Sequence, residues 1–246
     1  MNELLNRKIE DNPDDVLKEE LENGAFTGHP NKLVCYIDLL GISDYYNELN
    51  EMTIEEVKRE VDRKFLQGLL TVISFIKKSK EEIYSFHILS DSIIIVPKSR
   101  PLNNKSTPTI GDFFREIIFY CFETLLAHNN PSRVLITRGQ YFSLGIADHN
   151  LNILLGGEVF LKCNVADKVE LKGRGAGIFS DINEFTGRND SKWHLIDIDI
   201  FKDCIASRDK IKIGLEETRN KFIDRQKNKI NNVYDNLKDW ATGLKK

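Results

Sequence analysis

Two patterns of apolar residues alternate along the central part of the chain, one typical of strands and the other of helices. Apolar, β-branched and aromatic residues run together over residues 33–38, which predicts a buried strand that ends in a turn at Gly41. Thr53 followed by Glu56 is the pattern of a helix capping box. Apolar residues then recur at helical spacing over residues 54–76, which predicts a long helix.

The next segment predicts a hairpin, a helix and a strand. Residues 83–89 and 92–97 are apolar runs joined closely at Asp91, so we expect two strands with this aspartate at the turn. An aromatic-rich helical pattern covers residues 110–128, and a long strand pattern covers residues 133–146.

The last third repeats both patterns. Residues 151–155 predict a returning strand, residues 158–171 a helix, residues 176–180 and 194–200 two strands, and the segment from residue 211 an amphipathic helix. This order of elements predicts an α+β fold, a split βαβ sheet of the ferredoxin-like kind, with helices on one face and a C-terminal helix added.

The chain divides into three predicted parts. Residues 1–31 are predicted to form a polar N-terminal segment with a short helix over residues 14–23. Residues 32–205 are predicted to form the main domain, and residues 206–246 a C-terminal helical appendage.

Composition narrows the class of protein. The 246 residues include 41% hydrophobic residues, enough for the core of a globular protein. The net charge of -3 gives no basic field, so we expect no nucleic-acid partner. No segment has the apolar length of a membrane span, and four cysteines without CxxC spacing are typical of a reducing compartment. We expect a cytoplasmic protein without a membrane partner.

Asp38 and Asp91 are the best indication of chemistry. Both lie in apolar runs, where a carboxylate is costly unless a cation neutralises it. In a split βαβ sheet the end of the first strand and the turn of the central hairpin are neighbours, so the two should meet and form a divalent-cation site. Taken singly, each would be an ordinary turn residue.

Four segments together resemble the class III nucleotidyl cyclases, which include adenylate and guanylate cyclases. YIDLLGI (residues 36–42) is similar to the family's F-x-D-I-x-G-F segment, and SDS (90–92) to its second metal-binding turn. RVLITRG (133–139) is similar to the R-I-G-I-H-x-G strand, and CNVADKVE (163–170) to V-N-x-A-x-R-L-E. The segments come in the family's order.

The resemblance implies a two-metal reaction in which the ribose 3′-hydroxyl attacks the α-phosphorus and pyrophosphate leaves. It implies two divalent cations, Mn²⁺ or Mg²⁺, and a homodimer with composite active sites. Asn164 would orient the ribose, and Lys168 would take the place of the transition-state arginine. The remaining matched positions are Asp38, Asp91 and the carbonyl of Leu39 as metal ligands, and Gly41, Ile42, Ser43 and Arg138 for the phosphates.

Three positions allow a second interpretation. Lys168 supplies charge without the bidentate geometry of arginine. An alignment of residues 157–159 with a G-x-A motif of divergent members would move the helix by three residues and change the roles of Asn164 and Lys168. Arg138 could pair with a carboxylate instead of phosphate.

The residue that contacts the base differs from both purine signatures. The family places lysine for adenine or glutamate for guanine four residues before the second metal aspartate, and His87 stands there. The chain is also similar to the stand-alone pyrimidine cyclases of Pycsar antiphage systems. We therefore expect UTP, or CTP, to be converted to a cyclic second messenger that a separate effector protein reads. Adenylate cyclase and a degenerate cyclase-fold nucleotide-binding module are the alternatives.

Overall fold

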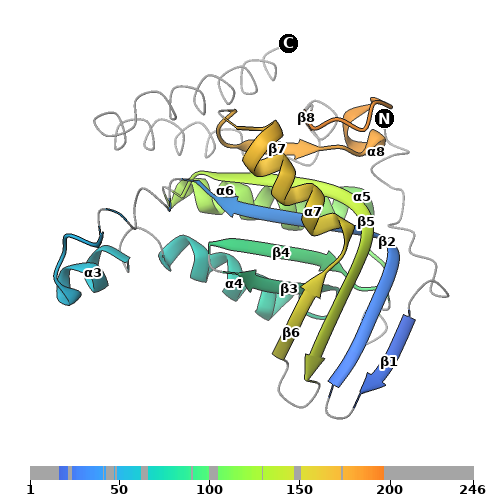
Figure 1. The fold of residues 1–246 in the computed structure, drawn as a ribbon, viewed down its shortest axis with the longest axis horizontal. Helices are drawn as coiled ribbons and strands as arrows, with labels where there is room; N and C mark the ends of the chain where they lie inside the picture. Colours follow the sequence, from blue (N-terminus) through green and yellow to red (C-terminus); the bar gives the residue numbers. More distant parts are fainter. Residues whose placement is uncertain are drawn as a thin grey trace.

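A computed structural model gives the fold of the chain (Figure 1). It describes residues 17–21, 24–40, 42, 47, 49–61, 66–89, 91–99, 105–128, 130–146, 151–172 and 174–196. These residues form an eight-stranded sheet in the order β3-β4-β2-β5-β7-β8, with β1 paired to β2 and β6 paired to β5. Only β5 and β7 pair in parallel among the described strands.

The centre of the sheet is a split βαβ unit. β2 (Gly24–Leu39) lies between β4 (Ser92–Pro97) and β5 (Ser132–Ile146), antiparallel to both, and β3 (Tyr84–Leu89) pairs with β4 as the predicted hairpin. This arrangement confirms the predicted α+β class and the ferredoxin-like order of strands.

Helices connect these strands. The predicted capping box is present, because the Thr53 amide and hydroxyl donate to Glu56 at 2.9 and 2.8 Å. The described helices of the two connections are α3 (Ile54–Val61) and α4 (Gln67–Ser79), then α5 (Ile110–Phe113), η3 (Phe114–Phe119) and α6 (Tyr120–Ala127).

The two faces of the sheet are covered differently. The main core joins α4, α5, η3 and α6 to one face, where Val72, Ile76 and Phe113 pack on Ile37 and Ile95. The prediction of helices on one face therefore holds for the split unit. α7 (Glu158–Val165) and η5 (Ala166–Glu170), which follow it, cover part of the opposite face.

The ends of the sheet depart from the sequence-based boundaries. The expected helix over residues 14–23 is wrong, because β1 (Leu17–Leu21) pairs with the first half of β2, and ladder hydrogen bonds outweigh a weak helical propensity. β2 also runs through the expected boundary at residues 31 and 32.

The remaining strands complete the sheet. They are β6 (Leu151–Gly156), β7 (Gly177–Ser180) and β8 (His194–Leu195), with the short helix α8 (Asn183–Thr186) between the last two. The predicted C-terminal helix lies outside the described residues. Within the described part of the chain, no helix combines the length and apolar content needed to cross a membrane.

Candidate active site

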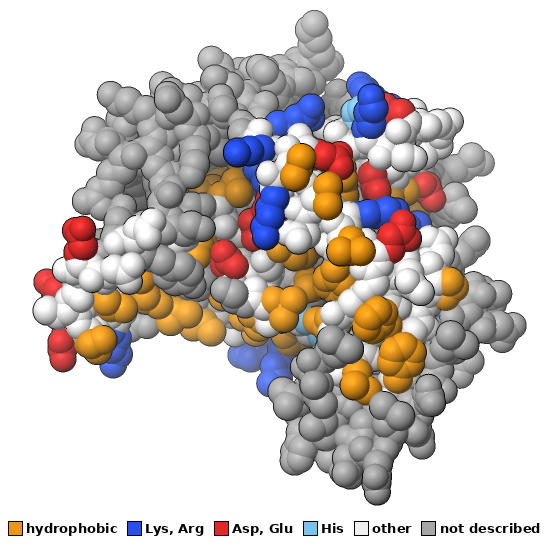
Figure 2. All heavy atoms as spheres, viewed as in Figure 1, with side chains coloured by type: hydrophobic (Ala, Val, Ile, Leu, Met, Phe, Trp, Pro, Cys, Tyr) orange, Lys and Arg blue, Asp and Glu red, His pale blue; other side chains and the backbone are white. Residues whose placement is uncertain are grey.

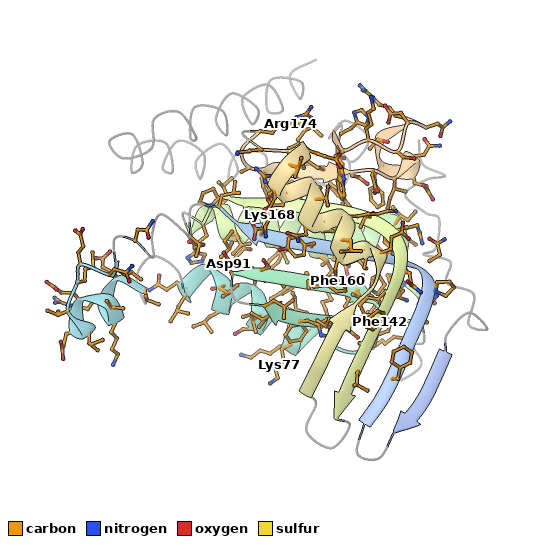
Figure 3. The ribbon with its side chains drawn as sticks, viewed as in Figure 1. Lys77, Asp91, Phe142, Phe160, Lys168 and Arg174 are labelled. Carbon is orange, nitrogen blue, oxygen red and sulfur yellow. The ribbon has the colours of Figure 1, made fainter. Side chains whose placement is uncertain are left out.

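Asp38 and Asp91 are neighbours, as the strand order predicted. Asp38 pairs with Ser92 in the ladder between β2 and β4, and Asp91 is the turn residue just before Ser92. The amide of Leu39 donates to the main-chain oxygen of Asp91 at 3.2 Å. This hydrogen bond fixes the end of β2 against the tip of the hairpin, so the two aspartates share one edge of the sheet. Figure 3 shows Asp91 at this edge.

The surroundings of Asp38 favour its neutral form. Its Oδ1 accepts a hydrogen bond from Ser92 Oγ at 3.0 Å, and the Ser92 and Tyr36 hydroxyls are 2.8 Å apart. Burial, followed by the negative charge of Asp167, raises the pKa of Asp38 to about 6, and Asp91 adds to the effect. The hydrogen bond from Ser92 lowers the pKa and offsets part of this shift.

A partly buried ion pair lies beside these carboxylates. Arg133 is the partner of Asp38 in the ladder between β2 and β5. Its Nη1 donates to the side-chain and main-chain oxygens of Asp167, the latter at 3.0 Å, and its Nε donates to the Gly175 oxygen at 3.3 Å. Arg133 thus ties η5 to the strand next to Asp38.

The donor set suits a hard divalent cation. Two neighbouring carboxylates repel each other when both are ionised, and a bound cation relieves this repulsion. The described residues contain no group of three or more His, Cys, Asp or Glu side chains that could hold a metal. Such a cation would therefore complete its oxygen shell with water, main-chain carbonyls and phosphate, as Mg²⁺ ordinarily does.

The raised pKa of Asp38 predicts how the stability of the metal-free protein depends on pH. The unfolded carboxyl has a pKa of about 4, so the folded state binds this proton more tightly. The resulting stabilisation is present below about pH 4 and is lost as the pH rises through about 6. In urea unfolding, Asp38→Asn should remove this loss, on the order of 1 kcal/mol after solvent screening. Equal pH slopes for the variant and the wild type would contradict the prediction.

α7 and η5 present Asn164 and Lys168 to solvent. Cys163 and Ala166 of the same segment are buried toward the sheet, which leaves both polar residues on the outer side. The helix starts at Gly157, whose φ of 114° favours glycine and where a Cβ would lie 2.2 Å from the Gln140 oxygen. The structure does not place either polar residue against the two carboxylates by any contact among the described residues.

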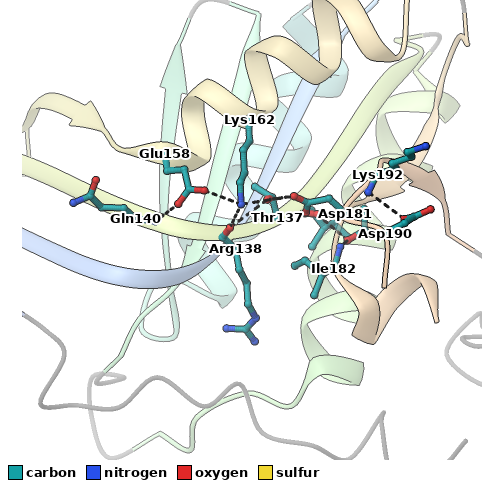
Figure 4. Close-up of polar contacts among 11 residues, drawn as sticks. Thr137, Arg138, Gln140, Glu158, Lys162, Asp181, Ile182, Asp190 and Lys192 are labelled. Carbon is teal, nitrogen blue, oxygen red and sulfur yellow. Dashed lines mark hydrogen bonds and ion pairs between the residues drawn. The ribbon is translucent and has the colours of Figure 1, made fainter. Parts of the chain in front are cut away.

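A polar cluster holds α7 on the sheet (Figure 4). Lys162 Nζ donates to the Arg138 main-chain oxygen at 2.9 Å and lies 3.0 Å from Glu158 and 3.9 Å from Asp181. Thr137 Oγ1 donates to Asp181 at 3.0 Å, and burial raises the pKa of Asp181. The cluster joins the helix that carries Asn164 to β5 and to the residue after β7.

His87 lies on the same face of the sheet as Asp38, but inside the protein. It is 8% exposed, and its Nε2 is 3.1 Å from the hydroxyl of Tyr141 on β5. Its Nδ1 is buried with no hydrogen-bond partner among the described residues. Burial lowers the pKa of His87 to about 4, so the imidazole is neutral at physiological pH.

Arg138, which the resemblance assigns to phosphate, is not brought to the two carboxylates. It pairs with Leu33, whose side chain belongs to the core on the other face. Because side chains alternate along a strand, the guanidinium leaves the sheet on the face opposite Asp38. Figure 4 shows it pointing away from Lys162 and Asp181.

The turn that the sequence predicts to bind phosphate is described in part. Ile42 is buried in the main core, and Leu39 is also buried. Gly41 and Ser43 lie outside the described residues.

The sequence did not predict a role for four residues of the site. Ser92, Arg133 and Asp167 lie in the segments that resemble the family, and Tyr141 lies outside them. Their importance depends on strand register and on helix packing across the sheet, which no local pattern reports.

Several solved structures resemble the fold. The guanylyl cyclase domain of the RhoGC fusion protein from Blastocladiella emersonii is 8% identical and has a TM-score of 0.42. The match covers 63% of this chain and 81% of the other. The guanylate cyclase domain of RhGC from Catenaria anguillulae, in complex with GTP, is 10% identical and has a TM-score of 0.41. The match covers 62% of this chain and 79% of the other. The adenylyl cyclase CyaB from P. aeruginosa is 13% identical and has a TM-score of 0.38. The match covers 67% of this chain and 81% of the other. No protein-family model matches the chain, and neither does any curated protein.

Proposed function

We propose that this protein is a metal-dependent nucleotidyl cyclase that converts a nucleoside triphosphate to the 3′,5′-cyclic nucleotide and pyrophosphate. The observation that carries the proposal is the contact between the end of β2 and the β3–β4 turn, which places Asp38 beside Asp91. Paired carboxylates at a partly open strand edge fit cations that arrive with phosphate.

The chain's own residues have distinct tasks in this proposal. Bound divalent cations would activate the ribose hydroxyl and neutralise phosphate charge. Asp38 and Asp91 hold these ions, and the Ser92 hydroxyl fixes the orientation of the Asp38 carboxylate. Asn164 orients the ribose, and Lys168 offsets the charge that develops on the α-phosphate.

A homodimer would bring these two sets of residues together. Leu161, Val165 and Val169 are 69%, 48% and 69% exposed, on the same segment as Asn164 and Lys168. Figure 2 shows apolar side chains among charged ones on this part of the surface. Exposed apolar residues on one helix favour burial against a partner, and a second copy of the chain would supply its own carboxylate edge.

The base proposed for the substrate is uracil, with cytosine second. His87 is neutral, so a base beside it would not meet the charge of a lysine or glutamate. The rings of Tyr141 and Phe160, with centroids 6.2 Å apart, lie on the same face of the sheet as His87. We propose that these rings leave room for a single-ring base and not for a purine.

We further propose a cytoplasmic role in antiphage signalling, in which a separate effector protein reads the cyclic nucleotide. Cys35, Cys121 and Cys163 are buried free thiols, which supports a reducing compartment.

Incubation with ATP, GTP, UTP or CTP plus Mn²⁺, followed by chromatography, tests the activity and the base together. We expect cyclic UMP as the main product. His87→Ala should reduce the preference for UTP over ATP by about tenfold while total turnover falls less, because we propose that this residue acts on the base and not on the phosphates. His194 on β8, a half-buried histidine paired with Asp190, provides the control, and His194→Ala should leave the preference unchanged.

Two contrary results of this assay are decisive. Cyclic AMP as the main product would overturn the pyrimidine assignment and leave the cyclase standing. UTP binding without any cyclic product would favour a nucleotide-binding module, for which the lysine at position 168 is the supporting observation.

A further inference from the structure

Arg133 stands opposite Asp38 but is paired elsewhere. The two are Cα partners in the β2–β5 ladder, so their side chains leave the same face of the sheet as cross-strand neighbours. Opposite charges at such positions ordinarily attract. Among the described residues, however, no ion pair joins them, and Arg133 is paired with Asp167 of η5.

The contacts to η5 decide where this guanidinium points. Nη1 donates to the side-chain and main-chain oxygens of Asp167, and Nε donates to the main-chain oxygen of Gly175. The Arg133 side chain is 7% exposed. A cation buried this deeply needs a carboxylate partner, because a buried charge without one is strongly destabilising. Asp38 is a second carboxylate near it, because the two residues are direct neighbours across the β2–β5 ladder.

An Arg133–Asp38 pair would compete directly with a metal ion. Guanidinium binds carboxylate oxygens through two parallel hydrogen bonds, and it would occupy the oxygens that a cation requires. With Arg133 held by Asp167, the Asp38 carboxylate instead accepts the Ser92 hydroxyl, a neutral donor that a cation does not have to displace.

We propose that Asp167 is a positioning residue that holds Arg133 away from Asp38 and so keeps Asp38 available to a divalent cation. The inference rests on the proposed function in one respect, the assignment of Asp38 as a metal ligand. It gives Asp167 a task apart from Lys168, the next residue along η5.

Binding of Mn²⁺ alone, measured on the full chain by the electron paramagnetic resonance signal of the free ion, tests this without any turnover. Asp167→Asn should weaken Mn²⁺ binding about tenfold, because Arg133 then turns to Asp38. The double variant Arg133→Met with Asp167→Asn should bind within about twofold of the wild type, since the competing cation is gone. Glu170→Gln, which removes an exposed charge from the same segment, should bind like the wild type.

The contrary results are equally specific. Asp167→Asn with wild-type affinity would overturn the inference, and so would a double variant as weak as the single one, because the loss would then come from the charge of Asp167 itself. A crystal structure of Asp167→Asn with Arg133 still on η5 would also overturn it.

Two further outcomes remain informative. Should Asp167→Asn fail to fold, the double variant is the test, because replacing an ion pair by neutral groups is often tolerated. Retained Mn²⁺ binding by the double variant supports the inference, and lost binding overturns it. No Mn²⁺ binding by the wild type at millimolar concentration would overturn the metal site itself, and this inference with it. Wild-type binding with an unaffected Asp167→Asn variant overturns this inference alone.

Discussion

Alanine at Asp38 or at Asp91 should abolish cyclic-nucleotide formation, with a loss of at least about 1,000-fold, while the fold remains. Each carboxylate would be a ligand of the ions on which the reaction depends, and neither lies in the apolar core. Removal of one also relieves the repulsion that helps to raise the pKa of Asp38. The melting temperature of the metal-free variants should therefore stay within a few degrees of the wild type.

The measurement is turnover of UTP with Mn²⁺, together with a thermal melt of each variant. Glu55→Gln is the matched control, because Glu55 is an exposed acid on α3. Substantial activity in either aspartate variant, with the control unaffected, would refute the two-metal site.

Mixing two inactive variants should restore activity, and this is the second large effect. Asp38→Ala removes the metal site of its own protomer, and Asn164→Ala removes the ribose contact that we propose it gives to the partner. In a dimer that exchanges subunits at random, a mixed pair keeps one intact composite site. Half of the dimers are then mixed, so we expect about a quarter of the wild-type rate.

A second mixture is the control for this recovery. Mixing Asp38→Ala with Asp91→Ala should restore nothing if each composite site draws both carboxylates from one protomer, although both variants keep the Asn164 segment of the wild type. Subunit exchange should be shown with tagged copies. Exchange without recovery in the first mixture would rule out the shared-site arrangement.

The split βαβ sheet could be predicted because its signals are local. Alternating and continuous apolar runs predicted the strands β3, β4 and β5, and the capping box at Thr53 predicted the start of α3. Local reasoning failed at β1, where helix and strand propensities are both weak and pairing with β2 decides the outcome.

The sequence by itself determined that Asp38 lies at the end of a buried strand and that Asp91 occupies a hairpin turn, and the order of the strands then made them neighbours. The sequence did not determine the register of strand pairing, and a shift in register by one residue turns every side chain of a strand to the other face. Only the tertiary structure decided that Arg138 faces away from the carboxylates and that Arg133 lies opposite Asp38. Packing of η5 across the sheet then turned Arg133 to Asp167. The physical reason is that these contacts join residues more than 30 positions apart, and the free energy that selects among them comes from burial and ion pairing in the folded chain.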